Sequence, residues 1–141
     1  MNNNPNIKLY SFTLDCKDPQ ELANFYAAML GWEVVYADAE FAVAGAPGVQ
    51  QGAYPGITFQ RSSAYRPPVW PDAPEAQRQM AHLDFAVNDI EQAVQHALTC
   101  GATEAAEQFS EHWRVMFDPA GHPFCLCGMK ELMESPHFAL R

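Results

Sequence analysis

Apolar and polar residues alternate near the start of the chain. This alternation of apolar and polar residues runs from Leu9 to Cys16 and predicts a half-buried β-strand. Phe12 and Leu14 lie on its apolar face, while Ser11 and Thr13 lie on the more polar one. The apolar face is expected to meet a helix and the polar face to remain accessible.

A helix is predicted directly after this strand. Asp18 is a good N-cap, and Pro19 suits the first helical position, where its missing N–H costs nothing. Gly31 is placed to end the helix in a left-handed conformation. Between these residues, apolar side chains recur at positions i, i+3, i+4, i+7 and i+8 and form one stripe: Leu22, Phe25, Tyr26, Met29 and Leu30. The helix is therefore expected to pack this stripe on a sheet.

Three β-prone runs follow the helix. Residues 32–36 and 40–44 predict a hairpin, and residues 57–61 predict a further strand. The segment 45–56 between them holds four Gly and two Pro, which predicts a loop. The first part of the chain therefore has the order β-α-β-β-β.

The same order of signals recurs about 70 residues downstream. Residues 82–88 alternate, with His82 and Asp84 on the polar face, and Asp89 is the next N-cap. A second stripe leads to Gly101: Ile90, Ala93, Val94, Ala97 and Leu98. Strands are then predicted at 103–106, 113–117 and 124–127.

The repeat predicts one domain over residues 1–141 made of two modules, 7–61 and 82–128. A proline-rich linker at 62–81 separates the modules, and 129–141 forms a tail. Trp70 in the linker packs either over a pocket mouth or a partner subunit, or onto the chain's own surface. The sequence leaves these alternatives open.

Composition excludes several classes of partner. With 48% hydrophobic and 18% charged residues, the chain is a folded globular protein. Its formal charge of -9 disfavours nucleic acid and anionic membranes. No apolar run is long enough to span a bilayer, and residues 1–6 do not resemble a signal peptide, so the expected location is the cytoplasm.

The four cysteines are expected to be reduced thiols. Cys125 and Cys127 are two residues apart on a predicted strand, so they point to one face and do not form a zinc knuckle. Buried, inert thiols are the favoured interpretation. The remaining histidines are interpreted as surface or turn residues: His96, His112, His122 and His137.

Three motifs together resemble the vicinal oxygen chelate superfamily, in its glyoxalase-like branch, which includes bleomycin-resistance proteins. They are Phe25-Tyr26-x-x-x-Leu30-Gly31-Trp32, the strand and cap from His82 to Asp89, and Phe117-Asp118-Pro119-x-Gly121-x-x-Phe124-Cys125. The resemblance covers about residues 7–128. It implies an α+β fold in which two βαβββ modules form a half-open, barrel-like cleft with the helices outside. Homodimers are also expected from it.

Members that use a metal supply His, Gln or Glu ligands from the first and last strand of each module. The matching positions here are Ser11, Gln60, His82 and Cys125. His82 is a good ligand, but a serine hydroxyl is a poor one, and Cys125 stands where a carboxylate is expected. The resemblance therefore implies the scaffold more strongly than it implies the metal chemistry.

The favoured hypothesis is a cleft that binds a small, oxygenated or aromatic organic molecule without metal or other cofactor. In it His82 is a neutral residue held by Asp84, and Trp113 is available for stacking. The predicted ligand-binding residues are Ser11, Thr13, Gln60, His82, Asp84, Trp113 and Cys125.

Three alternatives stay open. One is a lyase or dioxygenase that uses a divalent metal held by His82, Gln60 and Cys125. Another is a metal-free lyase or epimerase-like enzyme with His82 or Asp84 as general base. The third is a dimeric interaction protein with a filled cleft. The sequence does not decide whether the protein is an enzyme.

Overall fold

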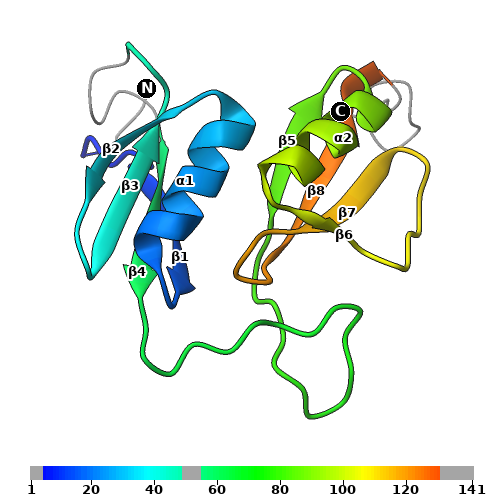
Figure 1. Ribbon diagram of the computed structural model, residues 1–141, viewed down its shortest axis with the longest axis horizontal. Helices are drawn as coiled ribbons and strands as arrows, with labels where there is room; N and C mark the ends of the chain where they lie inside the picture. The colour runs from blue at the N-terminus through cyan, green and yellow to red at the C-terminus, as the bar shows by residue number, and fades with distance from the viewer. Residues whose placement is uncertain (1–4, 49–54, 131–141) are drawn as a thin grey trace. The chain divides into compact units, whose positions relative to one another are not determined.

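The computed structural model describes residues 5–48 and 55–130, which form an α+β structure (Figure 1). The chain divides between Tyr65 and Arg66 into two compact units. Within the described residues, each unit contains one complete helix and one four-stranded sheet. The fold class predicted from the sequence, α+β with two βαβββ modules, is thereby confirmed. Half of the predicted loop 45–56 and most of the tail lie outside the described residues.

The first unit has the predicted order of elements. They are β1 (Ser11–Cys16), α1 (Pro19–Leu30), β2 (Glu33–Ala37), β3 (Phe41–Gly45) and β4 (Gly56–Arg61). The strands lie in the order β1-β4-β3-β2, with β1 and β4 parallel and the other pairs antiparallel. The first strand of the unit is therefore joined to its last, and α1 packs on β2, β3 and β4.

Helix α1 forms for the reasons that the sequence suggested. The Asp18 carboxylate accepts a hydrogen bond from the Glu21 amide at 3.1 Å, and Gly31 ends the helix at φ 68°. The start of the apolar stripe is buried, and the Tyr26 ring stacks on Phe59 of β4 with centroids 5.6 Å apart. This packing holds the helix on its sheet.

The second unit repeats this arrangement. It consists of β5 (Leu83–Val87), α2 (Ile90–Cys100), β6 (Thr103–Glu104), β7 (Trp113–Phe117) and β8 (Pro123–Gly128). The strand order is β5-β8-β7-β6, with β5 parallel to β8 and the other pairs antiparallel. Every residue of β8 is buried, so this strand is the centre of the unit.

Two predictions, the start of the first strand and the burial of one residue of the second helix, are wrong. The strand predicted from Leu9 begins only at Ser11, because Leu9 is 69% exposed and has no core to alternate against. Leu98 was expected in the buried stripe of α2, but it is 37% exposed, while Val94 and Ala97 are buried. The two-residue strand β6 offers little surface for the last turn of this helix.

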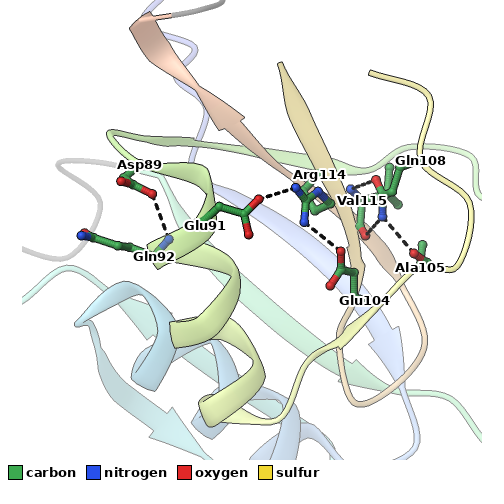
Figure 2. A network of polar contacts seen from close by, with 8 residues as sticks. All are labelled: Asp89, Glu91, Gln92, Glu104, Ala105, Gln108, Arg114 and Val115. Carbon is green, nitrogen blue, oxygen red and sulfur yellow. Dashed lines mark hydrogen bonds and ion pairs between the residues drawn. The ribbon is translucent and has the colours of Figure 1, made fainter. Parts of the chain in front are cut away.

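The short strand β6 is continued by a side chain (Figure 2). The Gln108 amide donates to the carbonyl oxygens of Ala105 and Val115 at 3.0 and 2.9 Å, and its oxygen accepts from the Val115 amide at 2.9 Å. The side chain thus imitates a paired strand at the edge of β7. On the side of the sheet that carries α2, the Arg114 guanidinium donates hydrogen bonds to the carboxylates of Glu91 of α2 and Glu104 of β6.

The linker packs on its own unit. Trp70 makes edge contacts with Phe109 and Phe117, so it packs onto its own unit, and a contact with a partner subunit stays a prediction. Pro67 lies so close to Gly121 that a Cβ atom on this glycine would be 2.7 Å from the Pro67 Cβ. Gly121 also has φ 91°, which L residues rarely adopt.

Neither helix in the described parts of the chain is long and apolar enough to cross a membrane.

Replacing Gln108 by alanine should destabilise the protein by about 2 to 3 kcal/mol, because three hydrogen bonds at a strand edge are lost. Gln95→Ala, on the exposed surface of α2, is the matched control and should change stability by less than about 0.5 kcal/mol. Urea denaturation measures both. Equal effects of the two substitutions would show that the Gln108 contacts are not structural.

Gly121→Ala should cost more stability than Gly31→Ala. Both place alanine at a positive φ, but only at Gly121 does the new methyl group meet Pro67. Adding Pro67→Gly should recover the part of the loss that comes from the collision. Thermal denaturation of the two single variants and the double variant tests this, and an absence of recovery would contradict the proposed contact.

Candidate functional site

Two of the predicted site residues, His82 and Asp84, lie at the β5 edge of the second sheet. Nε2 of His82 lies 3.2 Å from Oδ1 of Asp84, so the expected contact between these residues is confirmed. The residues are two apart, which places both side chains on one face of the strand. Their side chains are 38% and 60% exposed, so the pair is accessible from solvent.

Cys125 lies beside this pair on β8, in register with Asp84. Donor atoms of His82, Asp84 and Cys125 all fall within 4.8 Å of one another. Burial, followed by the negative charge of Asp84, raises the pKa of the Cys125 thiol to about 12. The thiol is therefore protonated at neutral pH, and the group of three combines an imidazole, a carboxylate and a neutral thiol.

The same face continues with Cys127 and Trp113, which pair in register. Burial and the Asp84 carboxylate raise the pKa of the Cys127 thiol to about 11. Trp113 is 36% exposed, so part of its ring faces solvent. Strands β5 and β7 are separated by β8, so Trp113 lies about 10 Å across the sheet from Ala86, which is two residues along β5 from Asp84 and four from His82. The predicted buried thiols are thus confirmed at Cys125 and Cys127.

The other predicted site residues belong to the first unit. The Ser11 hydroxyl lies 2.6 Å from the Thr58 hydroxyl and donates to the Gly56 carbonyl at 3.3 Å. Thr13 and Gln60 are exposed on β1 and β4. The structure thus brings His82, Asp84 and Cys125 together in one unit. The roles of Ser11, Thr13 and Gln60 as ligand contacts stay predictions.

A metal of the kind that the fold family implies fits these residues only in part. One nitrogen, one oxygen and one sulfur donor within 4.8 Å match the number and kind of atoms that bind zinc in proteins. However, Cys125 would have to lose a proton against its raised pKa, and the Ser11 hydroxyl is already bonded to Thr58. Asp84 was not among the predicted metal ligands, and the part of Gln60 as a metal ligand stays a prediction.

Two residues of these groups were not among the predicted site residues. Thr58 is the partner of Ser11, and the only sign of it in the sequence was its place on the polar side of its strand. Cys127 was predicted to share the face of Cys125 because of the two-residue spacing, but only as a buried thiol.

Of the histidines expected in turns, His122 bonds the buried Asp118 carboxylate at 2.8 Å, which agrees with a structural role. His137 lies outside the described residues.

A hollow of about 520 Å³ lies elsewhere in the second unit. Residues of the linker and of the turn before β8 line it, among them Pro67, Trp70, Phe117 and Pro119. None of the predicted ligand-binding residues belongs to its lining. Trp70 and Phe117 also pack against the buried cluster that contains Cys125 and Cys127, so the hollow adjoins the buried part of this face.

Comparison with known families identifies the scaffold. A family described as Glyoxalase-like domain matches residues 11–127, which run from the first residue of β1 to the last residue but one of β8. No curated protein matches the sequence.

Solved structures with the same fold include the trypanothione-dependent glyoxalase I of Leishmania major, 16% identical over 95% of each chain with a TM-score of 0.63. A fosfomycin resistance protein of Listeria monocytogenes is 14% identical over 86% of this chain and 92% of its own, with a TM-score of 0.60. A bleomycin resistance determinant encoded on transposon Tn5 is 15% identical, over 86% and 97%, with a TM-score of 0.55. The chain belongs to the glyoxalase-like family of the vicinal oxygen chelate superfamily.

Proposed function

We propose that this protein binds a small oxygenated or aromatic molecule, without a metal, on the polar face of its second sheet. The observation that carries the proposal is the contact between His82 and Asp84 beside the protonated thiol of Cys125. In this arrangement the imidazole of His82 lies against the carboxylate of Asp84. Together they offer a ligand hydrogen-bond donors and acceptors at the accessible edge of the sheet.

The composition of the face supports an aromatic ligand. Polar groups lie at the β5 edge, and the half-exposed ring of Trp113 lies two strands away. Because Trp113 lies opposite Ala86, two residues along β5 from Asp84, the span from Asp84 to Trp113 is about 12 Å, the length of an extended two-ring compound with a polar substituent. Stacking on Trp113 and a hydrogen bond to Asp84, which His82 contacts, would hold the two ends of such a molecule.

A second candidate function is supported by the donor cluster itself. His82, Asp84 and Cys125 would hold a divalent ion, and a bound ion would polarise the oxygen atoms of a substrate, as in a lyase or dioxygenase. The raised pKa of Cys125 places this candidate second, because the ion has to displace the thiol proton.

Further properties are proposed from the family resemblance and composition. We propose that both modules form a single domain and that the protein is a cytoplasmic homodimer. The net charge of -9 supports the absence of nucleic acid as a partner. A dimer with a filled cleft and no ligand is the competing hypothesis.

The protonated state of Cys125 predicts a specific loss of stability in alkali. A thiol whose pKa is raised from 9.0 to about 12 by folding stabilises the folded state below pH 9, and this contribution is lost as the pH rises towards 12. Urea denaturation at pH 8 to 11 should therefore show a steeper fall for the natural protein than for Cys125→Ala. Val115→Ala, in register with Cys125, is the control without a titratable group and should keep the steep fall.

Ligand binding is tested by thermal-shift screening of dialysed protein against catechols, quinones and hydroxylated aromatic amines. A compound present at 100 times its dissociation constant should stabilise the protein by about 2.7 kcal/mol. His82→Ala and Trp113→Leu should each remove the shift, while His112→Ala, an exposed histidine outside the cluster, should retain it. If no compound shifts the melting temperature, the filled-cleft hypothesis is favoured.

Metal analysis of the same dialysed samples by mass spectrometry separates the first two candidates. We expect no stoichiometric ion that depends on His82. One divalent ion per chain, retained in His112→Ala and lost in His82→Ala, would replace our proposal by the metal-dependent one.

A further inference from the structure

Helix α2 carries a second pair of metal-binding side chains, outside the cluster around His82. Nε2 of His96 lies 3.8 Å from Sγ of Cys100, four residues further along the helix. Residues four apart lie on the same side of a helix, one turn above the other, so the helix itself sets this distance. The contact is exposed, and a dissolved ion can reach it.

The separation of the two atoms suits a tetrahedral ion. Zinc binds cysteine sulfur at about 2.3 Å and histidine nitrogen at about 2.0 to 2.1 Å, so a tetrahedral angle places the two donors about 3.6 Å apart. The observed 3.8 Å differs from this by a small rotation of either side chain. A zinc ion can therefore bind both atoms without a change in the helix backbone.

The charge around the pair also favours a cation. The amides of Gly101 and Ala102 cap the carbonyls of Ala97 and Leu98, but the last turn of α2 contains no basic side chain whose charge would offset the partial negative charge at the C-terminal end of the helix. Cys100 is the last helical residue and His96 is one turn earlier. An ion bound between them lies at the place where a positive charge stabilises a helix. The formal net charge of -9 adds a general attraction for cations.

We propose that His96 and Cys100 form a binding site for a zinc-type divalent cation, whose remaining coordination positions are taken by water. Binding forms one metal–nitrogen and one metal–sulfur bond, and the thiol proton is released to solvent. Burial raises the pKa of the Cys100 thiol, which weakens the site relative to one with a preformed thiolate. The bound ion links one turn of α2 and stabilises its C-terminal end.

The site is tested by titrating the full-length protein with Zn²⁺ in a calorimeter and with Co²⁺ in a spectrophotometer. The Cys125→Ser variant serves as the background, so that the cluster around His82 does not supply a sulfur ligand. We expect His96→Ala and Cys100→Ser each to weaken Zn²⁺ binding by about tenfold or more, because one ligand of two is removed. The cobalt–thiolate absorption band should persist in the Cys125→Ser background and disappear when Cys100→Ser is added.

Control variants make the outcomes distinct. His112→Ala removes another exposed histidine and should leave the affinity unchanged, and circular dichroism checks that every variant is folded. Unchanged Zn²⁺ affinity in both His96→Ala and Cys100→Ser, or absence of Zn²⁺ binding in the Cys125→Ser background, would overturn the proposal. Loss of binding in His82→Ala alone would assign the ion to the other cluster, which bears on the proposed function and not on the helix site.

Discussion

The parallel pairing of the first and last strands is the constraint on which each module depends. In the second unit it makes β8 a central strand with β5 on one side and β7 on the other, and all of its residues are buried. A carboxylate at position 125 would place a charge on this strand, beside the carboxylate of Asp84. A neutral cysteine there avoids that cost. The chemistry of the face therefore depends on the accessible strand β5, where His82 and Asp84 lie on either side of Leu83.

Features determined by neighbouring residues could be predicted from the sequence. Both helix starts follow from Asp18 and Asp89, whose side chains bond the backbone three residues later, and the contact of His82 with Asp84 follows from the two-residue period of a strand. Features determined across long separations could not. The start of β1 depends on its pairing with β4, and the hydroxyl contact of Ser11 with Thr58 joins residues 47 apart.

The short strand β6 shows why a propensity for β-structure does not fix the length of a strand. The Ala105 amide still donates to the Val115 carbonyl at 3.1 Å, but the Val115 amide donates to the Gln108 side chain and not to the Ala105 carbonyl, so the regular pairing of segment 103–106 with β7 ends there. The sequence gives no local sign of this competition, because it depends on how the loop after β6 returns to the sheet. The resemblance to the family could predict the order of the strands but not this replacement.

The charges of the second sheet restrict the class of ligand that its polar face would bind. Asp84 carries a negative charge there, and the neighbouring thiols are neutral at physiological pH. Arg114 of β7 does not offset this charge, because it points to the helix side and is paired with Glu91 and Glu104. A ligand with a carboxylate or phosphate next to Asp84 would therefore meet repulsion, whereas a hydroxyl or amine would find an acceptor. This electrostatic preference favours neutral or cationic oxygenated aromatics over anionic metabolites as ligands of the face.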